Sequence, residues 1–216
     1  MELSVKFNEN QLQNLRQNVM IRLSEHRFLH TVGVVAAAEK IAFYFPSLEV
    51  TEIAAAALLH DVTKELSVQE HCRLAEELSE PFSDEEIESE AILHSLSAPY
   101  MVMRDFGEFA TPDILSALKN HTTAEADMSL FDEVIYIADY VEDGRRYPAC
   151  IRVREMLYQG LSLAKSESDC ALALHKAVLE SLENTKNKLL FQGRVVNERT
   201  NRAIEYFSTL LKQMEN

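Results

Sequence analysis

Apolar residues recur at helical spacing along most of this 216-residue chain. Near the start, Leu12, Leu15, Val19 and Leu23 follow one another at intervals of three or four residues, which places them on one face of a helix. The chain contains only five glycines and five prolines, a scarcity that favours long uninterrupted elements over a turn-rich all-β fold. We therefore predict an all-α fold. Its helices are expected at about 9–24, 25–45, 50–64, 67–78, 83–94, 99–107, 112–121, 130–142, 148–160, 168–191 and 198–213.

Capping residues and helix breakers mark several of these boundaries. Ser67 and Ser83 are each followed three residues later by glutamate, the pattern of a capping box. Pro46 is expected to stop one helix, and Pro99 to start or kink another. Gly193 is expected to cap the end of a long amphipathic helix. Residues 134–137 have the propensity of a short strand, but their helical surroundings favour a helix.

Composition limits the kind of protein this can be. The chain is 47% hydrophobic and 26% charged, as is usual for a globular protein. We predict one domain over 1–216, with a core at about 20–165 and a C-terminal helical extension at about 166–216. A formal net charge of -14 argues against binding to nucleic acid or to an anionic membrane. There is no apolar stretch of membrane-spanning length, no visible secretory signal and no Cys-x-x-Cys pair among the three cysteines, so a cytoplasmic location is expected.

The candidate chemistry begins at the dipeptide His60-Asp61, which closes the apolar run 53–59. Adjacent His and Asp side chains on a helix lie about 100° apart, so both can reach a cation at its edge. Further histidines and one more aspartate recur at intervals too long for a local zinc finger, a spacing that fits several helices converging on one pocket. Imidazole and carboxylate together suit Fe, Mn, Co or Zn. The candidates are His30, His60, Asp61, His94, His121 and Asp139.

The order His30, His60-Asp61, Asp139 resembles the HD-domain superfamily of metal-dependent phosphohydrolases. The resemblance extends to the YqeK-type HD-domain phosphohydrolases, the symmetrical bis(5'-nucleosyl)-tetraphosphatase family, and covers about residues 20–215. It implies an HD-domain helical bundle that hydrolyses diadenosine tetraphosphate into two ADP by attack of metal-bound water or hydroxide. The segments that carry it are 26–31, 58–64, 94–100, 121–123 and 137–145.

The same resemblance implies a metal site. His30, His60, Asp61 and Asp139 are expected to bind a divalent metal, with iron as the first choice and Co, Mn or Zn as alternatives. Three roles stay open for His94 and His121: ligands of a second ion, with Asp61 bridging the two ions; contacts to phosphate; or buried structural groups. The site is thus expected to hold one or two ions.

Basic and hydroxyl side chains near these motifs are candidates for substrate binding. Lys64 is four residues after His60, which would place both on one helix face. Arg27 precedes His30 by three residues, and Thr122 offers a hydroxyl beside His121. The resemblance supports a phosphate contact for Lys64, and each of the three candidates has a plain alternative as a solvated or capping side chain. Asp61 and Lys64 are the expected catalytic residues, Asp61 as acceptor of the water's proton and Lys64 as a cation beside the ADP leaving group.

Arg145, six residues after Asp139, offers a guanidinium for bidentate contact with phosphate, and Arg146 is the alternative. The family usually has proline where this chain has Asp143, and that carboxylate either holds Arg145 or weakens its phosphate contact.

Three other functions remain open from the sequence: a different HD-type nucleotide phosphohydrolase, a non-catalytic module that binds ADP or an alarmone, and a helical interaction protein with buried histidines. The expected partners are a dinucleoside tetraphosphate and its ADP product, with no nucleic acid or membrane, and a homodimer is an open alternative.

Overall fold

The computed structural model describes residues 5–214, which form eleven α-helices, one short 3₁₀ helix and no strand. The prediction of an all-α fold is confirmed, including the helical assignment of residues 134–137. None of the helices among these residues is long and apolar enough to cross a membrane. The elements are α1 (Glu9–Met20), α2 (Glu25–Ala42), α3 (Val50–Leu59), α4 (Val68–Glu77), α5 (Asp84–Glu88), α6 (Glu90–Asp105), η1 (Gly107–Phe109), α7 (Pro112–Asn120), α8 (Leu130–Val141), α9 (Pro148–Leu163), α10 (Glu167–Phe191) and α11 (Glu198–Met214).

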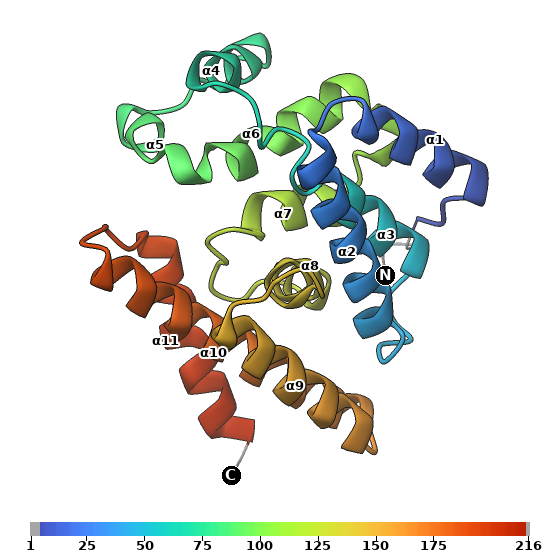
Figure 1. The fold of residues 1–216 in the computed structure, drawn as a ribbon, viewed down its shortest axis with the longest axis vertical. Helices are drawn as coiled ribbons and strands as arrows, with labels where there is room; N and C mark the ends of the chain where they lie inside the picture. Colours follow the sequence, from blue (N-terminus) through green and yellow to red (C-terminus); the bar gives the residue numbers. More distant parts are fainter. Residues whose placement is uncertain (1–4, 215–216) are drawn as a thin grey trace.

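Helix α8 lies at the centre of the molecule, where Figure 1 views it almost along its axis. It packs against α2, α3 and α7 on one side and against α9 and α10 on the other. All five residues from Val134 to Ala138 are buried, because neighbouring helices cover this helix on nearly every side. Burial on all sides also explains the short, unbroken apolar run that looked like a strand in the sequence.

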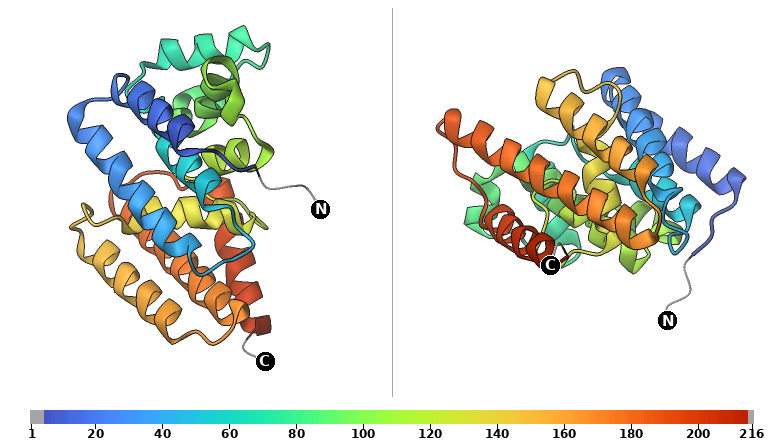
Figure 2. Two further views of the ribbon diagram at one scale, coloured as in Figure 1. Left: turned by 90° about the vertical axis from the view of Figure 1, so that its right-hand side faces the viewer. Right: turned by 90° about the horizontal axis from the view of Figure 1, so that it is seen from below.

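The C-terminal helices pack onto the rest of the chain. Figure 2 shows α9 and α10 side by side, and α10 also contacts α8 and α11. One cluster of buried apolar side chains runs from Phe7 to Phe207, so the first and last helices share a core. The boundary that we predicted near residue 165 stays a prediction.

The predicted caps form at three helix starts. The Ser67 side chain accepts the Glu70 N–H, and the Glu70 carboxylate accepts the Ser67 N–H in return. Ser83 and Glu86 form the same capping box, and Thr111 accepts the N–H of Ile114 at the start of α7. Each cap satisfies backbone donors that a helix start leaves unpaired.

Three helices end earlier than predicted, and the first of them is α1, which ends at Met20 rather than near residue 24. Helix α2 ends at Ala42 and is followed by turns rather than continuing to Phe45. Helix α3 ends at Leu59 rather than Lys64, and the backbone then makes successive turns, among them Lys64 N–H to the Asp61 carbonyl at 2.9 Å. The placement of Lys64 on one helix face with His60 was therefore wrong.

Two other predicted boundaries were wrong, since no helix starts at Pro99 and none stops at Gly160, while a kink at Pro99 stays a prediction. Pro99 lies inside α6. Helix α9 continues through Gly160 to Leu163, and a Cβ at Gly160 would lie 2.8 Å from the Ala173 Cβ. Glycine is thus used here for close packing of α9 on α10. Helix α10 begins at Glu167, capped by Ser166, slightly before the predicted start.

Candidate active site

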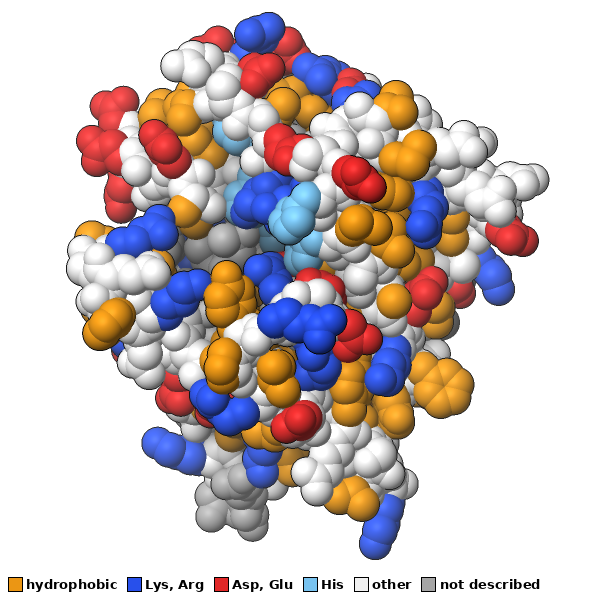
Figure 3. Space-filling view, in the orientation of Figure 1, with side chains coloured by type: hydrophobic (Ala, Val, Ile, Leu, Met, Phe, Trp, Pro, Cys, Tyr) orange, Lys and Arg blue, Asp and Glu red, His pale blue; other side chains and the backbone are white. Residues whose placement is uncertain are grey.

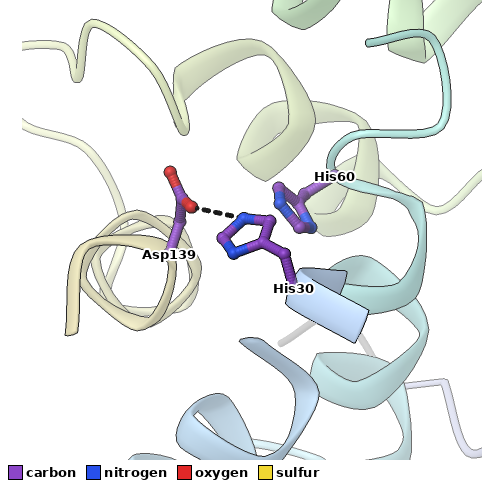
Figure 4. A group of neighbouring side chains, drawn as sticks. All are labelled: His30, His60 and Asp139. Carbon is purple, nitrogen blue, oxygen red and sulfur yellow. Dashed lines mark ion pairs between the residues drawn. The ribbon is translucent and has the colours of Figure 1, made fainter. Parts of the chain in front are cut away.

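The six candidate side chains come from helices α2, α6 and α8 and from the turns that follow α3 and α7. His30 from α2, His60 at the end of α3 and Asp139 from α8 form one group, in which one ligand atom of each lies within 4.8 Å of the others. Figure 4 shows these three side chains pointing toward one another. A second group has the same spacing and consists of Asp61, His94 from α6 and His121 at the end of α7.

Asp61 lies between the two groups. Its Oδ2 is 3.5 Å from His60 Nε2 and 3.9 Å from His30 Nε2. Its Oδ1 is 3.5 Å from His94 Nε2 and 3.7 Å from His121 Nε2. One carboxylate therefore presents a different oxygen to each pair of imidazoles.

Backbone carbonyls orient two of the rings. Nδ1 of His60 donates to the Ala57 carbonyl and Nδ1 of His121 donates to the Leu118 carbonyl, both at 2.7 Å. A carbonyl only accepts, so Nδ1 carries a hydrogen and each ring points its Nε2 atom toward Asp61. Histidines that bind metals commonly donate their other ring N–H in this way.

The residues fit a divalent metal. The Nε2 atom of His60 is buried and makes no hydrogen bond within the described part of the chain, whereas Nε2 of His30 lies 2.9 Å from Asp139 Oδ1. A buried nitrogen without a partner is costly, and a cation would satisfy it. Neutral imidazoles combined with carboxylates are donors that suit transition metals.

Glu142 supports His30, and the sequence analysis did not assign it a role. Its Oε1 is 3.2 Å from His30 Nδ1, and its Oε2 accepts the Gly144 N–H. Gly33 on α2 lies directly against this carboxylate, since a Cβ at Gly33 would be 2.5 Å from Oε2. The signals in the sequence for this contact were the position of Glu142 three residues after Asp139 and its place in the segment 137–145 that carries the resemblance.

The carboxylates control the charge of the site. Burial opposes a charge on His30, but the bonds to Asp139 and Glu142 prevail and raise its pKa to about 9. Burial likewise opposes ionisation of Asp139, yet His30 and Arg145 hold the pKa of this carboxyl well below its usual range. Asp61, despite its burial, also has its pKa held well below the usual range, by His60, His121 and Lys64. A metal ion binding at His30 would therefore displace a proton.

Arg27 and Lys64 both contact the centre of the site. Arg27 Nη1 donates to Asp61 Oδ2 at 2.9 Å. Lys64 Nζ is 2.8 Å from His94 Nε2 and 3.8 Å from Asp61 Oδ1, although it reaches them from a turn rather than from a helix face. Burial lowers the pKa of Lys64. The Thr122 hydroxyl lies 3.0 Å from the same His94 nitrogen.

Arg145 rather than Arg146 borders the site. Its guanidinium donates to Asp139 Oδ1 at 2.6 Å and to the Asp139 carbonyl at 3.1 Å, whereas Arg146 is exposed. Asp143 points into solvent and lies 3.5 Å from Arg154, so it does not hold Arg145.

A cavity of about 490 Å³ opens beside the second group. Its lining includes His94, His121, Thr122 and four basic residues, against one carboxylate, that of Asp139, among the described residues. Figure 3 shows histidine, lysine and arginine side chains gathered around a hollow near the centre of this face. The basic lining gives an anionic ligand a favourable site on a chain whose net charge is -14. The basic residues are Lys64, Arg145, Lys188 and Arg194.

Comparison with known proteins agrees with this geometry. Residues 27–144, more than half of the chain, match the family model described as HD domain. The chain belongs to the HD-domain family and is an HD-type phosphohydrolase.

Within this family the chain is related to the symmetrical bis(5'-nucleosyl)-tetraphosphatases, as the motifs predicted. It is 32% identical over 181 residues to the enzyme of Bacillus subtilis, covering 81% of this chain and 86% of that relative. It is 31% identical over 183 residues to the enzyme of Halalkalibacterium halodurans, covering 83% of this chain and 88% of the relative.

A solved structure has the same fold. It is described as a predicted HD superfamily hydrolase involved in NAD metabolism from Clostridium acetobutylicum. The two structures superpose with a TM-score of 0.75 at 26% sequence identity, over 95% of this chain and all of the other.

Proposed function

We propose that this protein is a metal-dependent hydrolase that cleaves diadenosine tetraphosphate symmetrically into two ADP. The observation that carries the proposal is the position of Asp61, which faces two groups of buried imidazoles beside a basic cavity. The names of the two curated relatives support the choice of substrate.

In this proposal His30, His60, Asp61 and Asp139 hold the metal, and iron is the ion we expect first, with Co, Mn or Zn as alternatives. When bound, such an ion polarises a phosphoryl oxygen and makes water a stronger acid at neutral pH. His94 and His121 either hold a second ion together with Asp61 or contact a phosphate group. Elemental analysis of the purified protein measures both the identity and the number of ions.

The basic residues bind and neutralise the phosphate chain. Lys64 and Arg145 line the cavity next to the metal ligands, and the planar guanidinium of Arg145 suits bidentate contact with phosphate. Arg27 approaches the same centre through Asp61. Thr122 offers a hydroxyl on the wall of the cavity. Together these groups stabilise the negative charge that develops on the ADP leaving group.

Asp61 is also the residue that binds the water molecule which attacks the phosphorus. Its neighbours keep its carboxyl ionised, so its oxygens can accept the hydrogen bond of that water. In the proposed reaction Asp61 is also the acceptor of the water's proton.

Analysis of the products tests the proposed function. The purified protein is incubated with diadenosine tetraphosphate, as isolated and with added Fe²⁺, Co²⁺ or Mn²⁺, and the products are separated by anion-exchange chromatography. We expect ADP alone, two for each substrate consumed. ATP plus AMP would contradict symmetrical cleavage, and faster phosphate release from nucleoside mono- or triphosphates would indicate another HD-type activity. Tight ADP binding without any turnover would indicate a non-catalytic module.

Substitution of Gly33 by alanine is expected to weaken metal retention by about tenfold or more, although it replaces no ligand. The new Cβ would lie only 2.5 Å from Glu142 Oε2. It would therefore push the Glu142 carboxylate away from His30 Nδ1, which that carboxylate now contacts. Metal content after dialysis against a graded chelator measures the effect. Gly107→Ala is the matched control, since a Cβ there meets nothing within 4 Å. Equal retention in both variants would show that Glu142 does not position His30.

A further inference from the structure

The cavity extends well beyond the groups assigned to metal and phosphate. Three of its lining residues, Lys64, His94 and Asp139, belong to the candidate active site, and we call this part the inner end. We call outer end the part lined by residues at the start of α9 and the end of α10, which the proposed chemistry does not use. They include Tyr147, Asn184, Lys188 and Gln192.

The outer end differs from the inner end in its chemistry. Tyr147, just before α9, presents an aromatic ring with 63% of the residue exposed, and Lys188 Nζ lies 5.3 Å from the centre of that ring. The amide side chains of Asn184 and Gln192 offer both donors and acceptors to a neutral polar ligand. An aromatic face combined with side-chain amides is suited to a nucleobase, which stacks on rings and forms hydrogen bonds at its edge.

The backbone at the end of α10 holds this outer wall in place. Gly193 has a φ of 68°, a left-handed conformation that favours glycine. The Gly193 N–H donates to the Leu190 carbonyl at 3.0 Å and the Arg194 N–H to the Leu189 carbonyl at 2.9 Å, the pair of bonds of a Schellman motif. The chain reverses here, so that both Gln192 and Arg194 border the cavity.

We propose that the outer end of the cavity is the subsite for one nucleoside end of the substrate, with Tyr147 as the stacking residue. This inference rests on the proposed function. All the outer residues lie beyond 27–144, the range that matches the HD domain. The HD core thus supplies the chemistry, while α9 and α10 select phosphate chains that carry a nucleoside. The C-terminal helices, which showed no chemical motif in the sequence, acquire a role in specificity.

Direct binding of two ligands to the metal-loaded protein tests the subsite. ADP carries a nucleoside and inorganic pyrophosphate does not, so their dissociation constants, measured by titration calorimetry, separate the two ends of the cavity. We expect Tyr147→Ala to weaken ADP binding by about tenfold and to leave pyrophosphate binding within about twofold of the original protein. Tyr147→Phe, which keeps the ring, is expected to restore ADP binding.

A control variant and a thermal unfolding measurement test whether the effect is specific to Tyr147. Phe43→Ala removes another exposed aromatic ring that does not line the cavity, and we expect it to change neither constant. The Tyr147 side chain makes no capping bond to α9, so Tyr147→Ala is expected to unfold at the same temperature as the original protein.

The outcomes separate this inference from the proposed function. Unchanged ADP binding in Tyr147→Ala, or an equal loss of ADP and pyrophosphate binding, would overturn the subsite even in an enzyme that cleaves diadenosine tetraphosphate. Selective loss of ADP binding in a protein that does not cleave this substrate would support the subsite and overturn the proposed function.

Discussion

Asp61→Asn is expected to lower the rate of diadenosine tetraphosphate hydrolysis by about a thousandfold or more. The substitution keeps the size of the side chain but replaces one oxygen by an NH₂ group, which cannot bind a cation or accept a proton. Stabilisation of charge at a metal centre contributes several kcal/mol, and about 4 kcal/mol corresponds to a thousandfold in rate. Because each Asp61 oxygen faces a different pair of histidines, neither orientation of the amide preserves both contacts. Steady-state assays at saturating substrate measure the loss.

A neighbouring aspartate provides the matched control for this substitution. The Asp143 side chain is 97% exposed and lies near Arg154, so Asp143→Asn is expected to keep activity within about twofold. The thermal unfolding midpoint of each variant confirms that it is folded. If the Asp61→Asn enzyme retained a tenth of the original activity, that result would contradict the role of Asp61 in the proposed mechanism.

Phe207→Ala is expected to destabilise the whole protein by about 3–5 kcal/mol, because truncating a buried phenylalanine loses burial and leaves a cavity. Phe207 is fully buried on α11 and belongs to the same apolar cluster as residues of α1 and α2. A loss of this size is a large part of the roughly 5–15 kcal/mol by which a typical domain is stable. Urea unfolding followed by circular dichroism is expected to show one transition at a lower midpoint.

Phe191→Ala is the control for this experiment. Phe191 ends α10 and is 94% exposed, so its removal is expected to change stability by no more than about 0.5 kcal/mol. Two separate transitions, or a shift in Phe207→Ala as small as that of the control, would show that the C-terminal helices unfold independently. That result would contradict the prediction of a single domain over the whole chain.

Local patterns predicted the secondary structure well where the cause was itself local. The capping boxes at Ser67 and Ser83 formed as expected, because each depends on residues only three positions apart. Helix ends governed by tertiary contacts were missed. Helix α3 ends at Leu59, where the chain turns toward the groups around Asp61, and α9 continues through Gly160, which packs closely against Ala173 of α10.

In the candidate site, too, the sequence predicted the residues of local motifs but not the contacts made by packing. The sequence identified the six imidazole and carboxylate residues, because these residue types and their order resemble a family whose motifs repeat here. It did not identify Glu142 as the partner of His30, or Tyr147 and Asn184 as cavity walls. Those roles depend on which helices touch, and no short-range pattern encodes that.

From its sequence alone, this protein is helical, acidic and equipped with the donors of a metal centre, since periodicity, charge and residue type are properties of the chain itself. Only the tertiary structure decided that Asp61 faces four histidines and that basic side chains from distant helices border one cavity in an acidic molecule. The physical reason is that burial of the apolar faces brings α2, α3, α6, α7 and α8 together and α10 alongside, and the positions of the polar groups follow from that packing.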